Sequence, residues 1–285
     1  MMNLPQVVSV ENMRQSDRRT IERSVTSAEL MRRAAKGIFD SVQFVGRVAI
    51  VCGSGNNGGD GYALACILLE NGITPTIFRV SEKFSKDGLY YYQTAKSMGC
   101  EESSLNVPSP LLGFDIVVDC ILGTGFSGAL NGEVKRAVEE INSCSAYVIS
   151  ADINSGLNGD TGVAGEAVKS DLTVSIGSYK TGMFLNDAPY YIDKLINVDI
   201  GIEIINPEYN FMDNERLGMF EGYGSLVMTA AEFYEKTGYA PGECNIADVI
   251  SEMSENDRRT IVVKTEHSAV ISDIKYTYFC ADYAD

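Results

Sequence analysis

The chain has 285 residues, of which 45% are hydrophobic and 22% are charged. This length suits one large globular domain, or one domain with a small appendage. The formal net charge is −16, from 23 Lys and Arg against 39 Asp and Glu. Because such a surface repels nucleic-acid phosphates and anionic lipids, we expect neither a nucleic acid nor a membrane as a partner.

The amino-terminal residues contain no apolar leader segment, and no stretch approaches 18 apolar residues. The seven cysteines are odd in number, include no Cys-x-x-Cys pair, and lie mostly in apolar runs. Free cysteine in such runs acts as a small hydrophobic residue. We therefore expect a soluble cytoplasmic protein without disulfides or zinc.

The first segment predicts a helix that covers the core. Residues 26–29, Thr-Ser-Ala-Glu, have the spacing of a capping box. Leu30, Ala34, Ile38 and Val42 then recur every four residues and form an apolar stripe on one helical face. A role of this helix in a subunit interface is a further possibility.

The most informative stretch is Val48–Glu70. Residues 48–51 are apolar and predict a buried strand, and residues 62–69 predict a buried helix. The glycine-rich residues between them predict a turn whose N–H groups form an anion site at the helix start. The match to G-x-G-x-x-G is weak alone, and the next strand ends in Arg79 rather than in an acid for a ribose hydroxyl. Asp60 would repel a pyrophosphate there, so either Asp60 points elsewhere or a cation or sugar hydroxyls share the site.

The following residues alternate between predicted strands and helices. Near-continuous apolar strands in such an alternation indicate an α/β fold with a parallel sheet covered on both faces. The predicted strands are residues 75–80, 114–119, 147–151, 172–176 and 195–198, and the predicted helices are residues 86–98 and 133–142.

Three of these strands end in a glycine-containing loop with Asn or Asp. The loops contain the sequences NNGGDG, DCILGTGFSG and DINSG. All strands of a parallel sheet end at one edge, where ligands bind. A single such turn is usually structural, but three at one edge predict a shared ligand site.

These motifs, with the lead-in sequences SVENMRQSDRRTIE and ELMRRAA, closely resemble the NAD(P)H-hydrate epimerase family, the YjeF N-terminal domain, from about Ser9 to Ile202. The resemblance implies a Rossmann-like three-layer αβα sandwich with a mostly parallel central sheet, usually as a homodimer. It implies interconversion of the R and S epimers at C6 of hydrated NADH and NADPH (NADHX and NADPHX). A dehydratase, expected on a separate chain, would then complete the cofactor repair.

The resemblance also implies site residues. One K⁺ per subunit would be held by Asn57, Asp119 and Ser155, and Asp152 would transfer protons and contact the substrate. Hard oxygen ligands suit such an ion. The other substrate-binding residues would be Asn56, Asn57, Gly58, Gly59, Asp60, Gly123, Thr124, Gly125, Phe126, Ser127, Gly128 and Ala129.

Two further positions qualify this assignment. Lys180 matches a family Lys-x-Gly turn and would help position the substrate. Asn154 stands where the family usually has proline in Asp-Ile-Pro-Ser-Gly, and losing the fixed φ of proline would loosen the turn that aims Asp152 and Ser155. Asn nevertheless tolerates turn geometry well.

The resemblance divides the chain into an epimerase-like domain, residues 1–205, and an appendage of unknown role, residues 206–285. The appendage has a faint ribokinase-like resemblance but no Gly-Ala-Gly-Asp turn, so we expect no dehydratase activity from it. Strand-like runs at residues 260–264, 269–271 and 276–280 predict a small α+β unit. His267, the only histidine, is expected in an exposed turn.

Two alternatives from other classes remain at this stage. A catalytically silent nucleotide- or protein-binding scaffold of the same fold would lack the reaction, although the presence of Asn57, Asp119, Asp152 and Ser155 favours activity. A nicotinamide-dependent oxidoreductase would share the fold class. The missing ribose-binding acid argues against that alternative.

Overall fold

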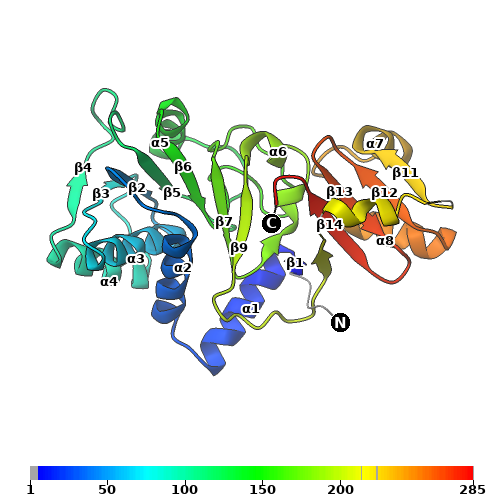
Figure 1. Cartoon of the computed structure of the whole chain (residues 1–285), viewed down its shortest axis with the longest axis horizontal. Helices are drawn as coiled ribbons and strands as arrows, with labels where there is room; N and C mark the ends of the chain where they lie inside the picture. Colours follow the sequence, from blue (N-terminus) through cyan, green and yellow to red (C-terminus); the bar gives the residue numbers. More distant parts are fainter. Residues whose placement is uncertain (1–5, 213, 223, 285) are drawn as a thin grey trace.

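The computed structural model describes residues 6–212, 214–222 and 224–284. Within them the chain forms two seven-stranded sheets flanked by helices (Figure 1). The sheet from the middle of the chain is named sheet B, and the sheet made mainly of carboxyl-terminal residues is named sheet A. The predicted α/β class is confirmed.

Sheet B is parallel throughout, with the strand order β4-β3-β2-β5-β6-β7-β9. The chain runs outward from β2 through β3 and β4, then returns to the other side of β2 at β5. The strand order therefore reverses between β2 and β5, where open α/β sheets bind ligands. The predicted strands of this region are all present. The seven strands are β2 (Val48–Cys52), β3 (Thr76–Arg79), β4 (Glu101–Ser103), β5 (Ile116–Cys120), β6 (Tyr147–Ala151), β7 (Leu172–Ile176) and β9 (Leu195–Val198).

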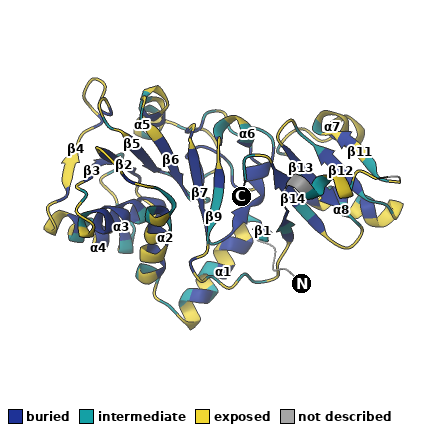
Figure 2. Cartoon of the chain, viewed as in Figure 1, coloured by how far each residue is buried: buried dark blue, intermediate teal, exposed yellow. Residues whose placement is uncertain are grey.

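Helices cover both faces of sheet B and complete the predicted three layers (Figures 1 and 2). Alternate residues of β2 face opposite sides: Ile50 packs with buried residues of α2, α3 and α4, and Val51 packs with buried residues of α5. Because both faces are buried, these strands are continuous apolar runs. The covering helices are α2 (Ser27–Ser41), α3 (Asn56–Glu70), α4 (Lys86–Ser97) and α5 (Gly132–Ser143).

The glycine-rich turn predicted after β2 is wrong in its extent, because α3 already begins at Asn56. Close packing explains why glycines occupy its first turns. A Cβ on Gly58 would lie 2.1 Å from the carbonyl oxygen of Gly53, and a Cβ on Gly61 would lie 2.8 Å from Cys52 Sγ. Part of the glycine pattern therefore allows the helix to start directly against the ends of two strands.

Sheet A has the strand order β11-β12-β13-β14-β10-β1-β8 and mixes parallel with antiparallel pairs. The three strand-like runs predicted near the carboxyl terminus are confirmed as β12, β13 and β14. The sheet also contains β1 and β8, which precede residue 206, so the predicted domain boundary falls within one continuous sheet. The strands are β1 (Gln6–Val8), β8 (Tyr179–Lys180), β10 (Tyr209–Phe211), β11 (Leu226–Thr229), β12 (Ile261–Lys264), β13 (Ser268–Ser272) and β14 (Thr277–Ala281).

Short helical elements and two longer helices complete the fold. Buried residues of α7 and α8 pack with those of sheet A, and this core includes Val7 and Tyr179 from β1 and β8. These elements are η1 (Thr181–Phe184), α6 (Ala188–Tyr191), η2 (Asn214–Met219), α7 (Ala230–Thr237) and α8 (Ile246–Asp257).

The segment that leads into sheet A also fixes α1 (Val10–Arg23). The Ser9 amide donates to the Glu208 carboxylate at 2.6 Å, and Asn12 Nδ2 donates to the Asn206 carbonyl at 2.9 Å. The Ile205 amide donates to Ser16 Oγ on the same helix at 2.9 Å. The carboxyl-terminal residues therefore help to set the position of the first helix.

The environment of His267 and the lengths of the helices can be compared with the sequence predictions. His267 lies exposed between β12 and β13, as predicted, with Nδ1 3.1 Å from an Asp282 carboxylate oxygen. Across the described residues, the helices are all too short or too polar to span a lipid bilayer.

We predict that Gly58→Ala destabilises the protein by roughly 1–3 kcal/mol, because the added methyl group would meet the Gly53 backbone. Alanine is otherwise about 1 kcal/mol better than glycine inside a helix, so propensity alone gives the opposite sign. Urea unfolding measures the effect. Gly165→Ala is the control, because a Cβ there meets nothing within 4 Å; equal stability of the two variants would contradict the packing role.

Candidate functional site

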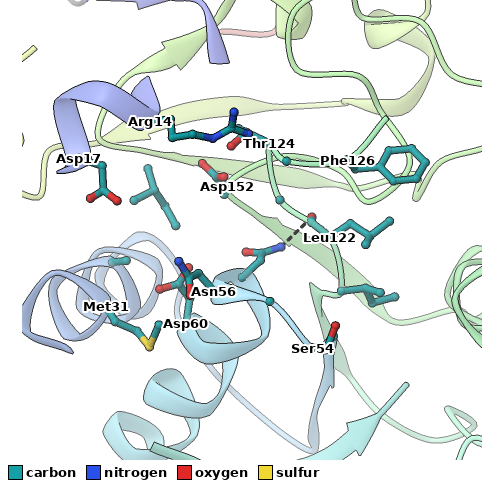
Figure 3. Close-up of a pocket in the computed structure, with 18 of the residues that line it drawn as sticks. Arg14, Asp17, Met31, Ser54, Asn56, Asp60, Leu122, Thr124, Phe126 and Asp152 are labelled. Atoms are coloured by element: carbon teal, nitrogen blue, oxygen red, sulfur yellow. Dashed lines mark hydrogen bonds between the residues drawn. The ribbon is translucent and has the colours of Figure 1, made fainter. Parts of the chain in front are cut away.

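A cavity of about 870 Å³ opens at the carboxyl-terminal edge of sheet B (Figure 3). Its walls include residues of α1 and α2 on one side and of the segments that follow β2, β5 and β6 on the other. The cavity lies where the strand order reverses. The three predicted loops therefore meet at one site.

Most of the predicted substrate-binding residues line this cavity. Gly58, Gly59, Gly128 and Ala129 do not line it, and Gly59 instead packs closely against Met31. Asp119 and Ser155 lie buried beneath its floor. The predicted residues that line it are Asn56, Asn57, Asp60, Gly123, Thr124, Gly125, Phe126, Ser127 and Asp152.

The loop after β5 offers backbone N–H groups to the cavity. Among the described residues, no protein acceptor meets the amides of residues 123–125 and 127, whereas the Phe126 amide closes a turn onto the Gly123 carbonyl at 3.1 Å. The first amides of α3, at residues 56 and 57, lack acceptors in the same part of the chain, as is usual in a first helical turn. These two sets of donors can bind an anion without a basic side chain.

Asp119, the penultimate residue of β5, organises the floor below this loop. Its side chain is fully buried. One carboxylate oxygen accepts from Ser155 Oγ at 2.5 Å and from the Ile121 amide at 3.1 Å, and the other accepts from the Ser155 amide at 2.9 Å and Ser150 Oγ at 3.0 Å. Burial raises the pKa of Asp119, and the bonds from Ser155, Ile121 and Ser150 oppose that rise. The carboxylate thus ties the ends of β5 and β6 together.

Asn57 extends this network toward the cavity. Its Nδ2 donates to the Leu122 carbonyl at 2.8 Å, and the Leu122 amide donates to Ser155 Oγ at 2.8 Å. The Asn57 Oδ1 atom is buried and has no hydrogen-bond partner in the structure. A buried acceptor without a donor is costly unless a cation or water meets it. The predicted ion ligands Asn57, Asp119 and Ser155 are therefore neighbours in one network, with one oxygen left to satisfy.

Asp152 directly follows β6 and faces the cavity (Figure 3). Its φ of 66° is in the left-handed region that non-glycine residues rarely adopt, and such backbone strain is concentrated at functional sites. Lys180 Nζ lies 2.5 Å from Asp152 Oδ1 and also donates to the Ile176 carbonyl at 2.9 Å. The Lys180 side chain is fully buried, whereas that of Asp152 is 18% exposed. Lysine holds one carboxylate oxygen from behind and leaves the carboxylate open to the cavity.

Asp17 and Asp60 are among the other acids that line the cavity with Asp152. Asp17 projects from α1 and Asp60 from the start of α3 (Figure 3). Burial is the main cause that raises the pKa of both, and repulsion from Asp152 adds to it. For Asp60 the pKa rises well above the usual range, with Lys180 as the opposing influence. Burial and the neighbouring carboxylates therefore disfavour the charged form of Asp60.

Sequence reasoning did not identify the contribution of α1 to the site. Met13, Arg14, Asp17 and Ile21 all line the cavity from this helix. Arg14 Nη2 lies 3.9 Å from the position of a Cβ on Gly125, so the guanidinium sits beside the loop after β5. The spacing of residues 13, 17 and 21 places them on one helical face, and this signal was available in the sequence.

Asn154 does not leave its turn loose. Its buried Nδ2 donates to the carbonyls of Val168 and Tyr191 and to Ser170 Oγ, each at 2.9 Å. Its Oδ1 accepts from Thr173 Oγ1 at 2.5 Å. These bonds supply the restraint that the usual proline would provide through its ring.

Comparison with known proteins agrees with this geometry. Residues 27–182 match the family described as YjeF-related protein N-terminus. The chain belongs to this family. It is 32% identical over 203 residues to the NAD(P)H-hydrate epimerase of Limosilactobacillus fermentum, covering 68% of this chain and 96% of that protein. It is also 32% identical over 238 residues to the bifunctional NAD(P)H-hydrate repair enzyme Nnr of Coxiella burnetii, covering 80% of this chain and 45% of that protein.

The YjeF-related fold is also shared with a solved structure. A crystal structure of the yeast protein ynu0 aligns with a TM-score of 0.55 and 22% identity, covering 62% of this chain and 82% of that chain. The chain thus spans about half the length of its bifunctional relatives and nearly all of the epimerases.

We predict that Asp60→Asn stabilises the protein at pH 7 and that this gain shrinks on acidification. Because the folded-state pKa of Asp60 is raised, the folded state binds more protons than the unfolded state between the two pKa values. Wild-type stability therefore falls as pH rises through this interval, and asparagine removes that penalty. Urea unfolding at pH 5 and pH 7 checks the prediction.

Glu255→Gln controls for the change in net charge, because Glu255 lies exposed on α8. A gain from Asp60→Asn that is no larger at pH 7 than at pH 5 would contradict the raised pKa.

Proposed function

We propose that this protein is an NAD(P)H-hydrate epimerase, which interconverts the R and S epimers of hydrated NADH and NADPH. One observation carries the proposal: a strained carboxylate, Asp152, faces the cavity with a buried lysine behind it. Free backbone amides line the same cavity. The names of the relatives that match this chain over most of their length support it.

Each part of the cavity suits one part of such a substrate. The free amides of the loop after β5 and of the α3 start would bind the pyrophosphate. Asp152 would then lie at the hydrated nicotinamide ring. Epimerisation at C6 needs either loss and return of the hydroxyl group or opening and closure of the ring, and both routes move protons. Asp152 would accept and return such a proton through its carboxylate.

Lys180 would act as a positioning residue. Its ammonium group holds Asp152 Oδ1 and the Ile176 carbonyl. The position of a Cβ on Gly123 lies 3.3 Å from Asp152 Oδ2, so the second oxygen lies toward the loop after β5. The lysine thereby fixes which carboxylate oxygen is available to a ligand.

A potassium ion is part of the proposal. Asn57, Asp119 and Ser155 would hold one K⁺ per subunit, and the unpartnered Asn57 Oδ1 supports this assignment. The described residues contain no group of three or more His, Cys, Asp or Glu that could hold a metal, and this ligand set includes only one such side chain. When bound, the cation would offset the negative charge of the carboxylates near a pyrophosphate.

The setting of the reaction is also proposed. The protein would act in the cytoplasm as a homodimer, and a dehydratase on another chain would complete the repair. Relatives in which the epimerase stands alone support this division of labour. Light scattering of the purified protein measures the oligomer.

We predict that Asp152→Asn lowers the rate of NADHX epimerisation by roughly 10²–10⁴-fold, because the amide cannot accept the proton. Chiral separation of the two epimers over time, corrected for the spontaneous rate, provides the measurement. Asparagine tolerates a positive φ, so the backbone conformation is retained. Calorimetric binding of NADH separates loss of chemistry from loss of the site. A variant that still binds NADH and epimerises NADHX at the wild-type rate would remove Asp152 from the mechanism. A wild-type protein no faster than the spontaneous reaction would indicate a silent scaffold.

We predict that KCl stabilises the wild-type protein more than LiCl at equal ionic strength. At a K⁺ concentration of a hundred times its dissociation constant, binding would add about 2.7 kcal/mol to the free energy of unfolding. Asn57→Leu removes the unpartnered oxygen and should abolish the difference. Ser150→Ala removes one bond to Asp119 without changing the proposed ligands, and it should keep the difference. Equal stability of the wild type in both salts would overturn the ion site.

A further inference from the structure

Acidic residues outnumber basic residues in the lining of the cavity. Arg14 is the only basic residue in its described lining. Against it stand five acids, one of which, Asp152, is paired with the buried Lys180. The acids of the lining are Asp17, Asp60, Asp87, Glu133 and Asp152.

The position of Arg14 suits the pyrophosphate of a dinucleotide rather than a 2′-phosphate. Its guanidinium lies beside Gly125, next to the free amides of the loop after β5. Its ion-pair partner among the described residues is Glu11, at 3.2 Å on the exposed face of α1. A substrate whose pyrophosphate occupies that loop would therefore engage the one arginine of the cavity.

Arg79 is not available to a further phosphate. It ends β3, the strand whose end carries the ribose-selecting residue in dinucleotide-binding sheets. Its guanidinium is held by Glu102 at 2.6 Å and by Glu82 at 3.0 Å, and it stacks over the ring of Tyr92 at 5.2 Å. Only 16% of its side chain is exposed, and it does not line the cavity.

The residues that do line the cavity beyond β3 are Val80, Ser81 and, on α4, Asp87. None of them carries a positive charge. Glu133, in the first turn of α5, places another acid on the rim. A 2′-phosphate adds further negative charge, and among the described residues no basic side chain lines this part of the cavity.

We propose that the cavity selects the hydrated dinucleotide without a 2′-phosphate, so that NADHX is preferred over NADPHX, with Asp87 and Glu133 as specificity-determining residues. The inference rests on the proposed epimerase function for the identity of the substrate. The charge of the cavity is independent of the proposed reaction, and it acts equally on intact NADH and NADPH. Long-range repulsion from a chain of net charge −16 acts in the same direction.

The test compares kcat/KM for NADHX and NADPHX over a range of salt concentrations. We expect at least a ~10-fold preference for NADHX at low salt. The preference should narrow as salt rises, because the Debye length falls to about 10 Å at 0.1 M. Titration calorimetry with intact NADH and NADPH measures the same discrimination without turnover.

The double variant Asp87→Lys with Glu133→Lys should reduce the preference several-fold, mainly by raising kcat/KM for NADPHX. The matched control is Glu252→Lys with Glu255→Lys, which makes the same change in net charge on the exposed surface of α8. The control should retain the wild-type ratio.

The outcomes separate the two proposals. Equal use of both substrates, a ratio unaffected by salt, or an equal shift in the control would each overturn the selectivity. Absence of epimerisation with weaker, salt-dependent binding of NADPH would overturn the epimerase and leave the charge selectivity standing. Equal binding of NADH and NADPH would remove the selectivity in either case.

Discussion

The ion pair between Lys180 and Asp152 is the contact on which the site depends most. A fully buried ammonium group is costly unless it is paired and hydrogen-bonded, and here a carboxylate, a hydroxyl and a carbonyl together satisfy it. Asp152 itself has a left-handed backbone conformation, which is costly for a non-glycine residue. Removing either partner would leave an uncompensated charge and a strained residue at the same place.

This ion pair connects the two sheets. Asp152 follows a strand of sheet B, whereas Lys180 belongs to β8 at the edge of sheet A. Strand β8 pairs with β1, β1 pairs with β10, and α1 begins directly after β1 with Arg14 and Asp17. The carboxyl-terminal residues therefore belong to the structural support of the cavity, although none of those that the structure describes lines it. A description of them as a separate appendage understates this role.

The sequence predicted the parts of the fold that local patterns determine. Sheet B and its helices follow from buried apolar runs between glycine-containing loops, and convergence of the loops follows from parallel pairing. Strand β1 has three residues and β8 has two, so neither carries a periodic pattern that could be recognised. Their pairing brings together residues more than 170 positions apart, such as Val7 and Tyr179. The shared helical face of residues 13, 17 and 21 is visible in the sequence of α1, but the part of the molecule that this face meets depends on the placement of β1.

The glycine pattern of α3 shows a different limit. From the sequence, its glycines predict ligand contact, because an open turn and a tightly packed helix start require the same residue type. Gly58 and Gly59 serve packing, whereas Asn56, Asn57 and Asp60 line the cavity. Composition indicates that a close approach occurs in this stretch, but only the packing shows whether a ligand or the protein itself makes it.

The cavity can be recognised by the costs that it imposes, independently of any resemblance. It contains a non-glycine residue with positive φ, two acids whose pKa is raised by burial, and a buried amide oxygen without a partner. Each feature disfavours the folded state, and the large apolar cores on both faces of sheet B offset them. Local violations of this kind persist where the arrangement serves binding or chemistry. Their concentration around Asp152, rather than the presence of any one of them, identifies this edge of the sheet as the functional site.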